Sequence, residues 1–223
     1  MPPPFYNITM NIELIYSFVI IICSLMIYFG TKELYELSSY KGLKYFRLSF
    51  LFFAIVYLFR FLIRLSLLTY NAPRMLDMTP RILGHSAQFI FMYFSSMAVF
   101  YLIYSIIWKK FKENSKTIYL FHGLALLLSS ITLFFRGPGI ILITNVFLLL
   151  FVVIIFLLSY KKSKIKKRGL NLYFAYILLF IFWILNIIDL LVPNFLELIQ
   201  LFIYLASLSI FLLILYKVLK KTG

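Results

Sequence analysis

Seven apolar runs, each long enough to cross a lipid bilayer, constrain the fold of this chain more than any other feature. A membrane-crossing helix needs about 20 mostly apolar residues, because backbone amides cannot be left unpaired in hydrocarbon. The 223-residue chain is 64% hydrophobic and only 13% charged, which leaves little room for a soluble domain. We therefore expect an all-α integral membrane protein in which residues 1–223 form a single polytopic membrane domain. Its predicted spans lie near 11–30, 46–68, 85–108, 117–135, 139–160, 170–191 and 195–216.

The distribution of Lys and Arg predicts the orientation of these spans, because cationic short loops stay on the cytoplasmic side. Three cations, Arg74, Arg81 and Arg136, fall on one side of the predicted membrane. Seventeen fall on the other side: Lys32, Lys41, Lys44, Arg47, Lys109, Lys110, Lys112, Lys116, Lys161, Lys162, Lys164, Lys166, Lys167, Arg168, Lys217, Lys220 and Lys221. We expect the N-terminus outside the cell membrane and the C-terminus in the cytoplasm.

The same distribution explains the net charge of +15, which resembles the footprint of a nucleic-acid-binding protein. The cations lie in short loops at the ends of spans rather than along one helix face. Topology and contact with anionic lipid headgroups account for them. We expect the lipid bilayer as a partner and no nucleic acid.

Arg60 and Arg64 are the outstanding polar residues within the apolar runs. They are four residues apart and so share one face of the second span. Counted from Tyr70, Arg60 lies about ten residues or roughly 15 Å along the helix, beyond easy snorkelling reach. Ionisable groups in hydrocarbon are costly and usually paired, so this pair marks the place to search for function.

Other polar residues in the same predicted half of the membrane complete a candidate pocket. Glu13 and Glu197 are candidate partners of the arginines, but each lies in the first turn of a predicted span, which favours a helix-capping role. Asn186 and Asp189, about one turn apart, are better partners for Arg60, either as structural links between helices or within a ligand pocket. The candidate pocket residues are Arg60, Arg64, His85, Gln88, Asn145, Asn186, Asp189, Glu197 and Gln200.

A weak internal repeat relates the third and seventh spans. Residues 93–103 match residues 204–214 with five identities in 11 positions, and Arg60 corresponds to Asn186 in a fainter match of the second and sixth spans. Three spans, one linker span and three further spans would give two parallel repeats. This organisation, the length and the outside N-terminus resemble the architecture of SWEET and PQ-loop transporters. The sequence contains no Pro-Gln pair, and no proline lies inside a predicted span.

The sequence contains no recognisable catalytic arrangement, so we expect no enzyme, cofactor or metal site. His85 and His122 would lie at opposite ends of antiparallel spans, which rules out a shared haem iron. No His-Glu-x-x-His motif is present. A transporter or permease for a small polar or anionic solute, with an outward-facing polar pocket, is one hypothesis. The alternative is a receptor-like sensor or accessory subunit acting through a partner membrane protein.

Overall fold

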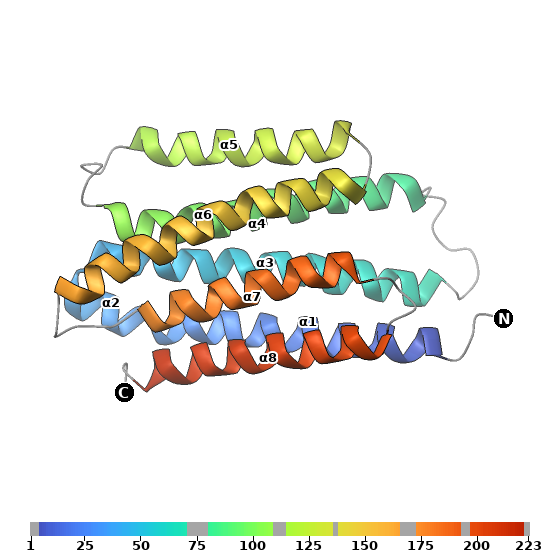
Figure 1. The fold of residues 1–223 in the computed structure, drawn as a ribbon, viewed down its shortest axis with the longest axis horizontal. Coiled ribbons are helices and arrows are strands. Elements are labelled where there is room, and N and C mark those ends of the chain that lie inside the picture. Colours follow the sequence, from blue (N-terminus) through green and yellow to red (C-terminus); the bar gives the residue numbers. More distant parts are fainter. Residues whose placement is uncertain are drawn as a thin grey trace.

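A computed structural model describes residues 5–70, 80–108, 115–135, 138–165, 173–192 and 197–220. These residues are helical, with short turns (Figure 1). The helices are α1 (Phe5–Gly30), α2 (Lys32–Ser38), α3 (Lys41–Tyr70), α4 (Pro80–Ile107), α5 (Ser115–Phe134), α6 (Pro138–Ile165), α7 (Tyr173–Leu191) and α8 (Glu197–Leu219).

Six of the helices in the described part of the chain are long and apolar enough to cross a membrane. They belong to α1, α3, α4, α5, α7 and α8, and by length and composition they indicate a multi-pass membrane protein. The described part of α6 contributes a shorter apolar stretch, Gly139–Ile155. The all-helical prediction is therefore confirmed, and membrane-spanning length is confirmed for six of the seven predicted spans.

Local chemistry explains where several helices begin and end. Pro80 and Pro138 each occupy the first position of a helix, where a missing backbone N–H costs nothing. At the end of α1 the Ile27 carbonyl accepts two hydrogen bonds from Thr31, one from its backbone N–H at 3.2 Å and one from its hydroxyl at 2.7 Å. Ser39 adopts a left-handed conformation, φ 49°, and so ends α2.

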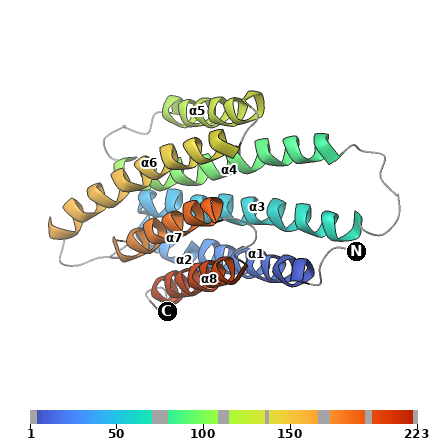
Figure 2. The same ribbon diagram turned by 45° about the vertical axis from the view of Figure 1, so that its right-hand side comes forward.

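Six long helices form a closed cycle of neighbours, in the order α1, α3, α4, α6, α7, α8 and back to α1. Gly30 shows how closely α8 returns to α1, because a Cβ there would lie 2.6 Å from Leu219 Cδ2. The remaining long helix, α5, lies outside this six-helix ring and packs mainly on α4 (Figures 1 and 2).

Successive long helices run in opposite directions, so the two termini lie at opposite ends of the bundle (Figure 1). We call the end at which α1 begins the N-end and the end at which α8 finishes the C-end. Exchanging α1, α3 and α4 with α6, α7 and α8 reproduces the neighbour pairs of the ring. The exchanged helices also run in the same direction (Figure 1).

Phenylalanine side chains fill the space between α3, α7 and α8. Phe50, Phe53, Phe182 and Phe211 are each no more than 2% exposed. Their ring centroids lie 4.7 to 6.4 Å apart in edge-to-face or tilted contacts, geometries that aromatic pairs prefer. The centre of the six-helix ring is therefore apolar. The charged residues described below lie toward one end of the bundle.

Candidate functional site

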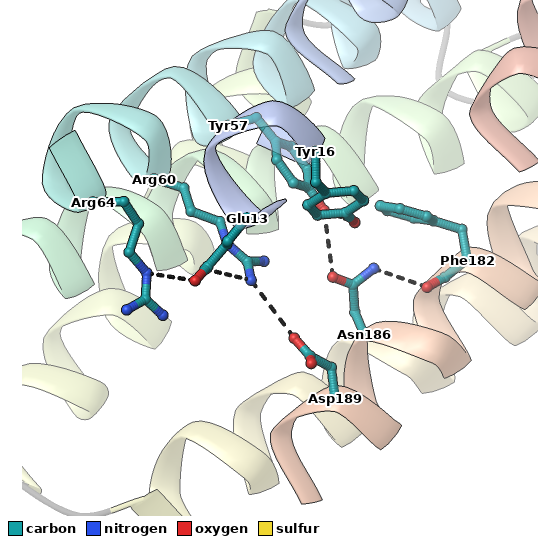
Figure 3. A network of polar contacts seen from close by, with 8 residues as sticks. All are labelled: Glu13, Tyr16, Tyr57, Arg60, Arg64, Phe182, Asn186 and Asp189. Carbon is teal, nitrogen blue, oxygen red and sulfur yellow. Dashed lines mark hydrogen bonds and ion pairs between the residues drawn. The ribbon is translucent and has the colours of Figure 1, made fainter. Parts of the chain in front are cut away.

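Glu13 holds two arginines of the neighbouring helix α3 (Figure 3). Its Oε1 lies 2.9 Å from Arg60 Nε and 2.8 Å from Arg60 Nη2, and its Oε2 lies 2.8 Å from Arg64 Nε. Glu13 is only 3% exposed. Such short contacts are typical of charge-assisted hydrogen bonds, which offset the cost of removing these ions from water.

The spacing of the arginines explains why one carboxylate serves both. Arg60 and Arg64 are one helical turn apart, so both guanidinium groups project from the same face of α3. That face packs against α1, which runs antiparallel to α3. One carboxylate between two side chains spaced in this way can offer each of them a different oxygen.

On the opposite side of Arg60, helix α7 supplies a second and longer contact. Asp189 Oδ2 lies 3.6 Å from Arg60 Nη2, so the predicted pairing of Arg60 with Asp189 is present. The other oxygen of Asp189, Oδ1, is buried and makes no hydrogen bond to the described residues. Asp189 is therefore held less firmly than Glu13.

Asn186 reaches the cluster through Tyr57 rather than through Arg60. The Tyr57 hydroxyl donates to Asn186 Oδ1 at 3.3 Å, while Asn186 Nδ2 donates to the Phe182 carbonyl at 2.8 Å (Figure 3). Since Tyr57 has one hydroxyl proton and uses it on Asn186, the Tyr16 hydroxyl, 3.1 Å away, donates to Tyr57. A hydrogen-bonded chain thus connects α1, α3 and α7.

Three tyrosines surround the Arg60 guanidinium. Its central carbon lies 5.7 Å from the ring centroid of Tyr16 and 5.9 Å from those of Tyr57 and Tyr204. Tyr16 and Tyr204 also stack on each other, with centroids 5.0 Å apart. The rings bring cation–π attraction and exclude water, which strengthens the ion pairs.

The site lies near the N-end of the bundle. Asp189 precedes the last residue of α7 by two positions, or about 3 Å of helix rise. Helix α3 continues well beyond the end of α7 (Figure 1). The Arg60 guanidinium contacts Asp189, so it lies close to the level at which α7 ends. Its depth from that end is therefore smaller than the roughly 15 Å counted from Tyr70.

The structure does not gather all nine predicted pocket residues. Arg60, Arg64, Asn186 and Asp189 lie together (Figure 3). Gln88 Nε2 instead donates to the Thr132 carbonyl of α5 at 3.4 Å. The side chains of His85 in α4 and Glu197 in α8 lie outside the described residues, and Gln200 is half-buried on α8.

Asn145 also has a local role that differs from the pocket role predicted for it. Its side chain donates to the Ile141 carbonyl of its own helix at 2.8 Å. Its backbone carbonyl accepts from Trp183 Nε1 at 3.3 Å, which links α6 to α7. His122 likewise serves a helix contact, since its Nδ1 lies 2.7 Å from the Tyr93 hydroxyl of α4.

Comparison with known proteins places the chain among relatives without assigning it a function. Over 214 residues it is 32% identical to an uncharacterized protein of Archaeoglobus fulgidus, a match that covers 94% of this chain and 92% of that protein. The chain belongs to the same family as this archaeal protein. No family model matches the chain, and no solved structure matches it.

The sequence favoured a capping role for Glu13 over pairing with the arginines, and it did not indicate the three tyrosines. The capping role predicted for Glu13 is wrong, because α1 begins at Phe5 and places Glu13 eight residues inside the helix, where its side chain is buried. A signal was available, since Tyr16 lies three residues after Glu13 and Tyr57 three residues before Arg60. Residues three or four apart share a helix face, so Tyr16 and Tyr57 could have been assigned to the charged faces, whereas no such spacing marks Tyr204.

Proposed function

We propose that this protein is a membrane transporter or permease for a small polar or anionic solute, which binds at the cluster of Glu13, Arg60, Arg64 and Asp189. The observation that carries the proposal is the placing of four ionisable side chains among membrane-spanning helices. Such groups are rare in hydrocarbon and usually mark a solute or ion pathway.

The unequal pairing of Arg60 supports a working site over a static link. Arg60 is held tightly by Glu13 of α1 and loosely by Asp189 of α7, helices from opposite halves of the ring. A solute can bind between Arg60 and Asp189 at the least cost in free energy, because the contact between them is long and Asp189 Oδ1 has no hydrogen bond within the described part of the chain to give up. Separation of the halves at the N-end would then expose Arg60.

The charge balance of the cluster bears on the solute. Two guanidinium groups face two carboxylates, so the four side chains together carry no net charge. An anionic solute would displace Asp189 from Arg60, and the planar guanidinium would hold a carboxylate or phosphate through two hydrogen bonds. A neutral polar solute would instead bridge Arg60 and Asp189 without separating charge.

We further propose seven spans with the N-end outside, the C-end in the cytoplasm and a parallel three-plus-one-plus-three repeat. Support for the repeat comes from the ring, whose neighbour pairs are unchanged when the first and second three-helix units are exchanged. Helix α5 would be the linker, which agrees with its place outside the ring. The cationic ends of the helices would contact anionic lipid headgroups of the cell membrane.

Flux through proteoliposomes tests the transport proposal. A panel of monocarboxylates, phosphate, sugars and polyols is first screened for solutes that raise the melting temperature of the purified protein, and uptake of each such solute is then measured. Arg60→Lys keeps the charge but loses the planar fork, so uptake should fall at least about tenfold if the fork holds the solute. Lys32→Arg, on an exposed side chain of α2, is the matched control.

Unchanged uptake in Arg60→Lys would contradict binding at this cluster. Failure of the whole panel in folded wild-type protein would instead favour the alternative, an accessory or sensor subunit. One observation supports that alternative. Helix α5 lies outside the ring with Tyr119, Leu120 and Phe134 strongly exposed, a surface that a partner membrane protein would cover. Stable co-purification of such a partner would favour it.

A further inference from the structure

A continuous line of side-chain contacts connects the charged cluster to the opposite end of the bundle. Along α3, Arg60, Tyr57, Phe53, Phe50 and Phe46 are spaced by three and four residues, so they lie on one face of the helix. This stripe extends about 21 Å at the helical rise. It faces α7 and α8, as the aromatic contacts of Phe53 with Phe182 and Phe211 show.

The C-end of this line is polar again. Phe46 contacts Tyr176 of α7, with ring centroids 5.9 Å apart. The Tyr176 hydroxyl lies 2.8 Å from Ser105 Oγ of α4. Ser105 already donates its proton to the Leu102 carbonyl at 2.6 Å, so Tyr176 donates to Ser105. This second hydroxyl cluster lies three residues from the start of α7, at the end opposite Asp189.

Between the two polar ends, phenylalanine side chains form the line, with Trp183 beside Phe53. The ring centroids of Tyr57 and Phe182 lie 6.3 Å apart, and those of Phe182 and Phe211 lie 4.7 Å apart. The centroid of Phe211 lies 6.3 Å from that of Phe50. Aromatic rings this close are in contact, and a hydrophobic constriction blocks ions and polar solutes by excluding water.

We propose that Phe50, Phe53, Phe182 and Phe211 are the permeability barrier of a solute route that runs between α3, α7 and α8. The route begins at the Arg60 cluster and ends at the hydroxyls of Tyr176 and Ser105, which form a second polar subsite for a small hydrogen-bonding solute. The barrier and the second subsite define a path for the transport proposed above. This inference rests on that proposed function. Its test requires no knowledge of the solute.

The test measures proton leak and glycerol entry in proteoliposomes under an imposed gradient. Phe211→Ala and Phe182→Ala shorten side chains inside the barrier, so both rates should rise about tenfold or more over wild type. The matched control is Phe202→Ala, on the same helix as Phe211 but 63% exposed, which should not leak. Phe211→Leu keeps an apolar filling and should stay tight. Folded Phe211→Ala and Phe182→Ala proteins that leak no more than Phe202→Ala would overturn the barrier.

Cysteine accessibility keeps the proposal falsifiable if the alanine variants do not fold. In a Cys23→Ala background, Tyr57→Cys should react with a water-soluble thiol reagent from the N-end only, Phe46→Cys from the C-end only, and Phe53→Cys from neither side. Reaction of Phe53→Cys as fast as Tyr57→Cys would refute the barrier, as would inert Tyr57→Cys and Phe46→Cys together. A leak pattern as expected without solute uptake by wild type would reject the transport function and leave the barrier standing.

Discussion

Glu13 and Asp189 both place a carboxylate beside Arg60, but they differ in the number and length of their contacts with the arginines. Glu13 uses both oxygens on two arginines at 2.8 to 2.9 Å, whereas Asp189 approaches one arginine at 3.6 Å. Removing one partner of a buried ion pair leaves its counter-ion uncompensated, and this penalty grows with the number of charges stranded. The stability of the bundle should therefore depend on Glu13 more than on Asp189.

We expect Glu13→Gln to lower the free energy of unfolding by about 3 kcal/mol, because Arg64 loses the carboxylate beside it and Arg60 keeps only the 3.6 Å contact with Asp189. Asp189→Asn should cost about 1 kcal/mol, since Arg60 retains Glu13. Thermal melting of the purified variants in detergent compares the two. Glu36→Gln, which removes the exposed Lys32–Glu36 pair, is the control and should change stability by less than about 0.5 kcal/mol. Equal losses from Glu13→Gln and Asp189→Asn would contradict the ranking.

A double-mutant cycle separates the two partners of Arg60. Alanine at both Arg60 and Glu13 should recover more of the single-mutant losses than alanine at both Arg60 and Asp189, because the closer pair has the larger coupling energy. The same melting measurements are made on the wild type, the two single mutants and the double mutant of each cycle. A larger coupling of Arg60 to Asp189 than to Glu13 would contradict the ranking that the 3.6 Å and 2.8 Å contacts predict.

At this scale, the sequence indicated the arginines and Asp189 but favoured another role for their main partner, Glu13. Arg60 and Arg64 stand out because charge is rare in an apolar run, and Asp189 was assigned by its place one turn from Asn186. Glu13 was misassigned because the start of the apolar run was taken as the start of the helix. Side-chain pairing between helices depends on their relative rotation, which one sequence does not determine.

Close approach of α3 and α4 depends on Gly42. A Cβ there would lie 2.6 Å from the Ser105 backbone carbonyl oxygen and 2.8 Å from Trp108 Nε1. A backbone atom cannot swing aside as a side chain can, so the start of α3 would have to move away from the end of α4. Small residues allow membrane helices to pack in this way.

We therefore expect Gly42→Ala to destabilise the bundle by about 1 to 3 kcal/mol through overpacking. Gly123→Ala on α5 is the matched substitution, because its Cβ would meet no atom within 4 Å. It should leave stability unchanged or raise it by about 0.5 to 1 kcal/mol, since alanine is the better helix former. Thermal melting reports both, and a neutral Gly42→Ala would mean that the two helices separate without cost.

Helix ends also show where sequence patterns lose their information. The predicted first span began at residue 11 and the third at residue 85, whereas α1 begins at Phe5 and α4 at Pro80. An apolar run reports where hydrocarbon begins, but hydrogen bonding continues a helix through polar residues beyond it. The α-helical class and the approximate centre of each helix were predictable, and the ends were not.

For the whole molecule, orientation is the most accessible prediction. In a Cys23→Ala background, Asp77→Cys should be labelled by a membrane-impermeant reagent on intact cells. Lys164→Cys should be labelled only after permeabilisation, because Lys164, near the end of α6, belongs to the cationic set that we expect in the cytoplasm. Native Cys23 is 2% exposed, so its removal should alter labelling little. The reverse pattern would place the Arg60 cluster on the cytoplasmic side.

The membrane class of the molecule could be predicted from hydrophobicity alone, because hydrocarbon imposes one solution on the backbone. The arrangement of helices could not. The closure of the ring by α1 against α8, and the position of α5 outside it, depend on side chains that are mostly apolar and nearly equivalent in lipid. Shape rather than polarity selects among such packings.

The contact between α3 and α7 also determines when the bundle can be completed during synthesis. Tyr57 and Asn186, which bond across this contact, are 129 positions apart in the chain. At an elongation rate of about 5 to 20 residues per second, α7 leaves the ribosome roughly ten seconds after α3. Until then Glu13 alone must neutralise Arg60 and Arg64, so the nascent bundle holds one excess cation. That charge must stay solvated by water or lipid phosphate, which should keep the first helices loosely seated until Asp189 arrives.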